Sequence, residues 1–339
     1  MICPKCGYTA GVADRFCENC GAALSKDVAP PSNDVAPPSN ASALQLCHCP
    51  PGQSKPDADG FCQVCGIRCI SEALAARKHV ELAIDERLAL VSDVGRKHPI
   101  NEDTGSVARG SGDSVVLVVA DGVSTSPNSA SGSEATVDVV VTALASVTED
   151  ASLSDAVRSA IAAANQAVLD LPDAGGEGDS AETTVVVALC RGGRVAVGWV
   201  GDSRAYLVGP DAAEQLTVDD SWVEEAVDGG EMPLEQAMLD KRAHLVTQVL
   251  GMRDQAADIH VIERELPEDR ALLLCSDGLW NYFLESADLT TALWRHDCGD
   301  TLSVCRYLVD TANERGGQDN VTVALLNARS QPALKWGEA

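Results

Sequence analysis

Short apolar runs separated by polar turns dominate the sequence from His79 onward, and their lengths are typical of β-strands. Residues 79–84 and 88–93 form a first pair of runs and predict a β-hairpin. Three further runs are mostly apolar and predict buried strands: VVLVVA, ALLLC and NVTVALL. Another pair, TTVVVALC and RVAVGWV, flanks Gly192-Gly193, whose freedom at positive φ favours a tight hairpin turn.

Segments with the period of amphipathic helices occur in pairs. The pairs are residues 131–148 with 152–170, and residues 285–297 with 300–314. The polar stretch 220–242 predicts a helix with breaks. Strands in hairpin groups and helices in pairs differ from the strict alternation of a doubly wound parallel sheet. We therefore expect an α+β fold of layered sheets with helices outside.

The N-terminal segment has a different composition, because nine of the 13 cysteines lie before residue 70. Residues 1–24 hold two Cys-x-x-Cys pairs, each followed by glycine, which predicts a zinc ribbon with tetrahedral thiolate ligands. Residues 45–70 resemble a second ribbon with a compressed first pair. The expected zinc ligands are Cys3, Cys6, Cys17, Cys20, Cys47, Cys49, Cys62 and Cys65.

Two open points concern these ribbons. His48 could replace one cysteine ligand, and the two ribbons could share ligands, so we expect one or two zinc ions. Disulfide pairing is the alternative, and the lack of a secretory signal disfavours it.

Residues 25–44, between the ribbons, contain the heptapeptide DVAPPSN twice. Its paired prolines predict an extended, semi-rigid linker, with a ligand for an SH3-type domain as the weaker reading.

Length and charge narrow the class of protein. The 339 residues, 45% of them hydrophobic, are enough for one large domain and smaller segments. The net charge of −26 repels nucleic-acid backbone and anionic membrane, so we expect neither as a partner. The sequence has no apolar run long enough to span a membrane and no signal peptide, which favours a cytoplasmic protein.

Aspartates stand at the ends of several predicted strands. Asp121, Asp202 and Asp277 each follow an apolar run, and Asp319 comes just before the last one. Carboxylates at strand ends on one edge of a sheet converge, and converging carboxylates bind hard divalent cations such as Mg²⁺ or Mn²⁺. The pattern therefore predicts a divalent-cation site. An acidic protein that handles phosphate also needs local positive charge, which such cations supply.

These aspartates belong to an ordered series of short motifs. In chain order the motifs are Ser92-Asp93-Val94-Gly95, Asn101-Glu102-Asp103, Asp121-Gly122, Gly201-Asp202-Ser203-Arg204, Ser276-Asp277-Gly278 and Asp319-Asn320. Over roughly residues 79–328 the series resembles the metal-dependent protein serine/threonine phosphatases of the type 2C family. The resemblance implies a four-layer αββα sandwich of two antiparallel sheets flanked by helices. It also implies hydrolysis of phosphoserine and phosphothreonine in protein substrates.

The resemblance further implies a ligand set for two Mn²⁺ or Mg²⁺ ions. Asp121 would bridge both ions, and the carbonyl of Gly122 would bind one. Asp277 and Asp319 would complete one ion's shell, and Glu102 would hold the other, directly or through water. Two cations that share a water lower its pKa, so that a bridging hydroxide can attack phosphorus in line with the departing Ser or Thr oxygen.

Two further positions of the resemblance concern a third ion and a gate. Asp202 with Asp277 matches the place where bacterial relatives bind a third ion, with a turn-forming role for Asp202 as the alternative. Asp220-Ser221 stands where the family's flap usually begins with His-Ser. We expect this flap, about residues 218–245, to gate substrate access and to disfavour acidic phosphopeptides.

Two departures affect substrate binding. His98 stands where the family often has an arginine that binds the substrate phosphate, so His98 is the candidate phosphate ligand. Arg96 or Lys97 could serve instead, or all three could be solvated loop residues. Val123 replaces the histidine that animal members carry as a candidate leaving-group acid. That role would fall to metal-bound water or stay unfilled.

The zinc ribbons are expected to dock the enzyme to a protein, with a serine/threonine kinase or its substrates as candidate partners. Nucleic-acid binding by the ribbons is disfavoured by their few basic residues. The alternative for the whole chain is a catalytically weak, phosphatase-like adaptor that binds phosphoproteins. The retained Asp121, Asp277 and Asp319 argue against it, because a decayed site has no reason to keep clustered carboxylates.

Overall fold

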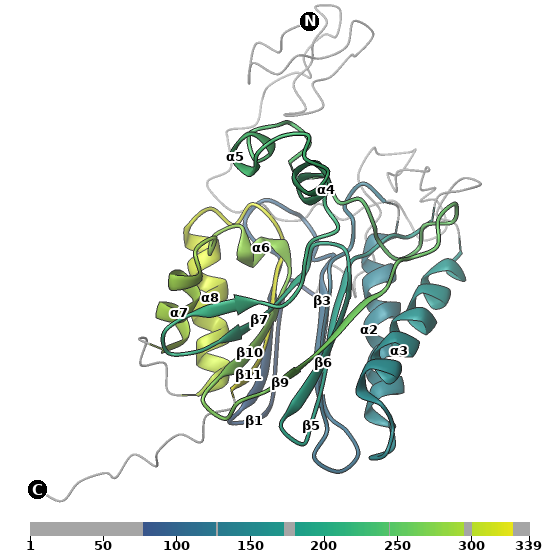
Figure 1. Cartoon of the computed structure of the whole chain (residues 1–339), viewed down its shortest axis with the longest axis vertical. Coiled ribbons are helices and arrows are strands. Elements are labelled where there is room, and N and C mark those ends of the chain that lie inside the picture. The colour runs from purple at the N-terminus through teal and green to yellow at the C-terminus, as the bar shows by residue number, and fades with distance from the viewer. Residues whose placement is uncertain (1–76, 127, 173–179, 244, 295–299, 328–339) are drawn as a thin grey trace, which may run out of the picture. The chain divides into compact units, whose positions relative to one another are not determined.

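The computed structural model describes residues 77–126, 128–172, 180–243, 245–294 and 300–327 (Figure 1). The predicted ribbons at 1–24 and 45–70, their cysteine ligands and the repeat linker at 25–44 lie outside the described residues. None of the helices in the described ranges is long and apolar enough to cross a membrane.

One antiparallel sheet has six strands in the order β1-β2-β11-β10-β7-β8. Its strands are β1 (His79–Asp85), β2 (Leu88–Asp93), β7 (Arg204–Val208), β8 (Ala213–Gln215), β10 (Ala271–Cys275) and β11 (Val321–Asn327). The predicted hairpin of residues 79–84 and 88–93 is confirmed as β1 and β2. The last strand of the chain, β11, lies between β2 and β10 and therefore in the middle of the sheet.

A second antiparallel sheet has five strands in the order β3-β4-β5-β6-β9. Its strands are β3 (Thr104–Arg109), β4 (Val115–Ala120), β5 (Val185–Arg191), β6 (Arg194–Val200) and β9 (His260–Glu265). The hydrophobic pattern does not predict β3 or β8. Both are edge strands, and only Val107 of β3 is a buried apolar residue, so neither carries the apolar run of a central strand.

Two helix pairs cover the outer faces of the sheets (Figure 1). The elements are α2 (Ser129–Ala145) with α3 (Leu153–Leu169), and α7 (Ser286–Trp294) with α8 (Thr301–Glu314). Two of these helices begin at side-chain caps, because Ser152 accepts a hydrogen bond from the amide of Asp155 and Asp300 accepts one from Ser303. The predicted helix pairs are confirmed.

The core divides into layers, as β10 illustrates. Leu272 and Leu274 face the other sheet, where they pack in one cluster with Leu117 of β4. Leu273 points the opposite way and packs with Leu308 of α8. This alternation follows from the two-residue period of a strand. With α2 and α3 packed on the outer face of the second sheet, the described body is the predicted four-layer αββα sandwich.

The stretch predicted as a broken helix forms two short ones, α4 (Trp222–Asp228) and α5 (Leu234–Ala237). A further short helix, α6 (Asp277–Trp280), begins at the end of β10. Figure 1 shows α4, α5 and α6 at the same end of the sandwich.

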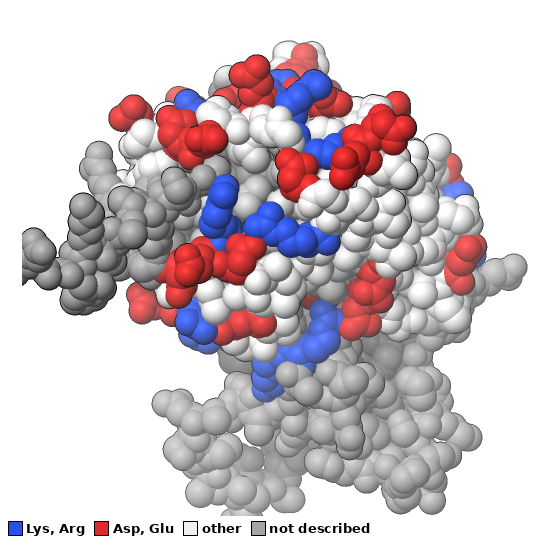
Figure 2. All heavy atoms as spheres, turned by 90° about the horizontal axis from the view of Figure 1, so that it is seen from below, with Lys and Arg blue, Asp and Glu red and all other residues white. Residues whose placement is uncertain are grey.

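Acidic and basic side chains lie next to one another at the end opposite α4 and α5 (Figure 2). Ion pairs in the described ranges include Arg109 with Asp85 at 2.5 Å and Arg194 with Glu263 at 2.5 Å. On the described part of this face, acidic side chains interrupt the basic ones, which disfavours a nucleic-acid backbone.

Candidate active site

Residues of the six-stranded sheet converge at one end through its antiparallel register. Asp93 at the end of β2 lies opposite Val321 at the start of β11. Cys275 at the end of β10 lies opposite Val323 on one side and Arg204 on the other. The segments that carry the aspartates of β7, β10 and β11 therefore share one edge.

The second sheet contributes its own strand ends. Ala120 at the end of β4 pairs with Thr104 at the start of β3, and Val200 at the end of β6 pairs with Val185. The residues just beyond these strands, among them Asp121, consequently lie together. Thr183 and Thr184, just before β5, clasp Asp121, since Thr184 exchanges hydrogen bonds with its backbone and the Thr183 hydroxyl donates to its carbonyl at 2.8 Å.

The carboxylates of the two sheets repel one another. Burial, together with the nearby charges of Asp103 and Asp277, raises the pKa of Asp121 well above its usual value. Burial and the charge of Asp319 raise the pKa of Asp277 to about 7. Burial, followed by the negative charge of Asp277, also raises the pKa of Asp202 well above its usual value. The structure thus brings the predicted Asp121, Asp202, Asp277 and Asp319 into one electrostatic cluster.

Two carboxylate oxygens in this cluster are buried without a hydrogen-bond partner, Oδ1 of Asp103 and Oδ1 of Asp277. Buried polar atoms are normally satisfied, and clustered anionic oxygens are the ligands of hard divalent cations. In the part of the chain that the structure describes, no three His, Cys, Asp or Glu side chains are already arranged to hold a metal ion. The oxygen donors fit Mg²⁺ or Mn²⁺, and direct ligation by three of them requires these side chains to move.

Asp103 also belongs to the carboxylate cluster, although the sequence did not predict it as a site residue. It is fully buried, and the Ser276 hydroxyl donates to its Oδ2 at 2.7 Å, which ties it to the turn before Asp277. Burial raises its pKa to about 7 despite that hydrogen bond. In the sequence, only its position directly after Glu102 indicates such a role. The strand that follows it, β3, is not predicted by the hydrophobic pattern.

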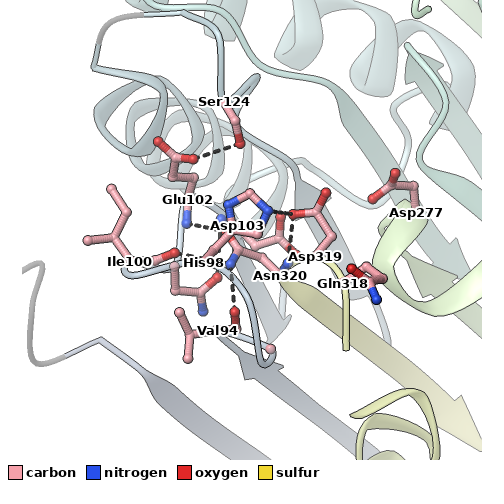
Figure 3. A network of polar contacts seen from close by, with 12 residues as sticks. Val94, His98, Ile100, Glu102, Asp103, Ser124, Asp277, Gln318, Asp319 and Asn320 are labelled. Atoms are coloured by element: carbon pink, nitrogen blue, oxygen red, sulfur yellow. Dashed lines mark hydrogen bonds and ion pairs between the residues drawn. The ribbon is translucent and has the colours of Figure 1, made fainter. Parts of the chain in front are cut away.

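Glu102 points toward the start of α2. The hydroxyls of Ser124 and Ser129 donate to its two carboxylate oxygens at 2.8 and 2.6 Å, and Figure 3 shows the Ser124 contact. Its backbone is fixed as well, because its amide donates to Oδ1 of Asn320 at 2.7 Å and its carbonyl accepts from Ser133. Each oxygen has a second lone pair, so Glu102 can approach a cation directly or through water while the serines hold its orientation.

Asn320 joins three segments at this point (Figure 3). Besides accepting from Glu102, its side-chain amide donates to the carbonyls of Val94 at 2.9 Å and Ile100 at 3.0 Å. The loop between these carbonyls carries His98, whose Nε2 lies 3.4 Å from Oδ1 of Asp319. The structure thus places the predicted phosphate ligand beside the carboxylate cluster.

The glycines of the two Asp-Gly motifs are required by close backbone approach. A Cβ at Gly122 would lie 2.8 Å from the carbonyl oxygens of Glu102 and Ser129. A Cβ at Gly278 would lie 1.8 Å from the carbonyl oxygen of Asn320. Each aspartate can therefore reach the cluster only because the next residue has no side chain.

Asp202 lies in a turn that is fixed by contacts with Trp280 and by the ion pair of Arg204. The indole of Trp280 donates to the Asp202 carbonyl at 3.0 Å. The guanidinium of Arg204 lies 3.6 Å from the centroid of the Trp280 ring and pairs with Asp219 at 2.6 Å. These contacts fix the turn beside α6, which begins at Asp277.

Comparison with known proteins finds a family model and several similar phosphatases. The family model described as Protein phosphatase 2C matches residues 95–303. The serine/threonine phosphatase stp of Listeria welshimeri is 29% identical over 242 residues, covering 69% of this chain and 93% of the relative. PstP of Mycobacterium tuberculosis is 31% identical over 261 residues, covering 73% of this chain and 47% of the relative. A structure of the PstP catalytic domain in complex with 2 manganese ions has a TM-score of 0.57 at 28% identity, covering 70% of this chain and 96% of that one.

Proposed function

The chain belongs to the protein phosphatase 2C family, and on that premise we propose that it removes phosphate from phosphoserine and phosphothreonine in proteins with the help of divalent cations. One observation carries the proposal. Carboxylates from both sheets meet at one end of the sandwich with raised pKa values and two unpartnered buried oxygens. Such a site favours binding of cations, and cations in turn attract a phosphate group.

The proposed ligands follow the strand ends. Asp121 would bridge two cations, Asp277 and Asp319 would bind one of them, and the Gly122 carbonyl with Glu102 would bind the other. Asp202 is the proposed extra ligand for a third cation. When bound, Mn²⁺ or Mg²⁺ would activate water and neutralise charge on the phosphoryl oxygens.

The chain's own residues orient these groups and the substrate. Asp103 braces the turn before Asp277 through Ser276, whose hydroxyl also accepts from the amide of Thr322 at 3.0 Å. His98 lies at the partly exposed rim, where its imidazole can donate to a phosphoryl oxygen while Asp319 orients the ring. Arg96 and Lys97 are exposed on the same loop and add positive charge near the substrate.

Turnover of p-nitrophenyl phosphate tests the proposal directly. We expect hydrolysis by the full chain that depends on Mn²⁺ or Mg²⁺ and stops in EDTA. Absence of turnover with either ion would favour the alternative of a phosphatase-like adaptor.

The flap predicts a preference for basic phosphopeptides. Glu225, Asp228, Glu231 and Glu235 on or beside α4 and α5 are exposed. Because this charge attracts cationic peptides and repels acidic ones, kcat/KM should be about tenfold higher for a basic than for an acidic phosphopeptide of equal length at low salt. The difference should shrink in high salt, because salt screens exposed charges.

The control is a variant in which these four flap carboxylates become amides. It should narrow the difference between the two peptides and leave p-nitrophenyl phosphate turnover unchanged. Equal rates on both peptides in the unaltered protein would contradict the prediction.

We further propose that the cysteine-rich segment binds zinc and docks the enzyme to a protein, a kinase or its substrate. Deletion of residues 1–70 should leave the rate on p-nitrophenyl phosphate within about twofold, because the carboxylate cluster is outside this segment. The rate on the physiological phosphoprotein should fall, because docking raises the local substrate concentration. Zinc measured per chain should be one or two in the full chain and none in the deletion. Equal loss on both substrates would contradict the docking role.

A further inference from the structure

Asp220 stands where the flap of the family usually has histidine. Its backbone and side chain together make four hydrogen-bond contacts. Its Oδ2 accepts from the Gly201 amide at 2.8 Å, and its own amide donates to the Gly201 carbonyl at 3.1 Å. Its carbonyl accepts from the amide of Thr247 at 2.8 Å, at the far end of the flap. A single residue therefore holds both ends of the flap and the residue before Asp202.

His260 holds the remaining carboxylate oxygen of Asp220. Its Nε2 lies 2.9 Å from Oδ1, and its ring stacks on Trp199 with centroids 5.0 Å apart. The Trp199 indole in turn donates to the carbonyl of Val218, at the start of the flap, at 2.7 Å. Because β9 and β6 are paired strands of the rigid sheet, His260 and Trp199 fix Asp220 against the sandwich.

The conformation of the Gly201 turn depends on its contacts with neighbouring residues. Gly201 has a φ of 101°, and a Cβ there would lie 2.7 Å from Cγ2 of Thr184. The Thr184 hydroxyl links two loops, because it accepts from the amide of Asp121 and contacts the hydroxyl of Ser203, the residue after Asp202. A shift of Gly201 therefore moves Asp202 relative to Asp121.

We propose that Asp220 and His260 are a positioning pair that couples the flap to the Gly201-Asp202 turn and thereby sets cation binding at Asp202. The inference rests on the proposed role of Asp202 and adds residues that do not themselves bind the cation. Flap opening that breaks the Thr247 or Gly201 contacts of Asp220 would loosen the turn, so flap position and cation affinity are linked.

Substitutions at Asp220 in the full chain separate this role from a general structural one. Asp220→Ala removes both carboxylate contacts, whereas Asp220→Asn keeps an acceptor for Gly201 and gains a donor for a neutral His260. Asp228→Ala is the matched control, because Asp228 is an exposed aspartate of the same flap. His260→Ala provides a second probe if Asp220→Ala does not fold.

Amide hydrogen exchange and Mn²⁺ calorimetry are the readouts. In Asp220→Ala the Gly201 amide should exchange about tenfold faster, and the weakest Mn²⁺ site should lose about tenfold in affinity. Asp220→Asn and Asp228→Ala should stay within about twofold of the unaltered protein, and His260→Ala should shift both readouts in the direction of Asp220→Ala. Excess Mn²⁺ should restore the turnover of Asp220→Ala but not that of Asp202→Ala.

The double variant Asp202→Ala/Asp220→Ala decides the coupling. If Asp220 acts through Asp202, the second substitution adds little loss of Mn²⁺ affinity. Full additivity, or equal Mn²⁺ affinity of Asp220→Ala and Asp228→Ala, overturns the inference. Unchanged Mn²⁺ binding in Asp202→Ala also overturns it, while metal-dependent turnover by the unaltered protein would leave the phosphatase proposal standing.

Discussion

Replacement of Asp121 by asparagine should abolish turnover and at the same time raise the melting temperature of the protein in EDTA. The two effects have one cause. Asp121 lies among Asp103, Asp277 and Asp319, so under the proposed function its negative charge would bind cations and would repel its neighbours when none is bound. Loss of the charge should lower p-nitrophenyl phosphate turnover at least about a thousandfold, equivalent to about 4 kcal/mol of transition-state stabilisation.

Thermal unfolding measured with and without Mn²⁺ tests the predicted change in melting temperature. In EDTA the Asp121→Asn variant should melt above the unaltered protein, and added Mn²⁺ should stabilise it far less. Asp228→Asn is the control, because it removes one exposed carboxylate from the flap and should change neither property. A variant that melts lower in EDTA, or keeps its Mn²⁺-dependent turnover, contradicts a cation-binding role for Asp121.

The stability of the cation-free protein should depend on pH in the direction opposite to that of a paired carboxylate. Asp103 and Asp277 have folded pKa values of about 7, above the usual value of about 3.9 for an unfolded aspartate. The folded protein thus holds protons that the unfolded chain releases. The contribution of these groups is fully present below about pH 4 and is lost as pH rises to about 7, with a slope of about 1.4 kcal/mol per pH unit for each proton.

Other carboxylates add their own pH dependence, so the difference between two proteins is the useful quantity. The stability of the unaltered protein minus that of Asp121→Asn, both in EDTA, should fall across this pH window, because the substitution relieves the repulsion. Denaturant unfolding at a series of pH values measures it. Saturating Mn²⁺ should reverse the trend, since cations bind the deprotonated carboxylates. A flat difference in EDTA would contradict the proposed repulsion.

The convergence of the aspartates was predictable from the sequence because strand ends are visible in it. Asp121 follows the apolar run VVLVVA, and Asp277 is one serine beyond ALLLC, so their place at a sheet edge could be inferred without coordinates. The role of Asp103 could not, since β3 is an edge strand with one buried apolar side chain and no apolar run marks its start. The orientation of Glu102 depends on Ser124 and Ser129, whose approach is set by the packing of α2.

The contacts of the flap could not be predicted from the sequence either, because they join residues far apart along the chain. Asp220 could be identified as a departure from the family pattern, but its partner His260 is 40 residues away and belongs to another strand. No local pattern links the two residues, because their contact arises only from the pairing of β9 with β6. Pairwise contacts of this kind require the folded sheet.

Asn320 has a consequence for synthesis of the protein on the ribosome. It lies 218 residues after Glu102, yet it fixes the Glu102 amide, and β11, which follows it, fills the middle of a sheet. While the chain is being made, the loop that carries Glu102, near the start of the body, must wait for the last strand to emerge. Chains released before β11 would thus leave an acidic, partly assembled half-site, and the cell would obtain phosphatase activity only from completed molecules.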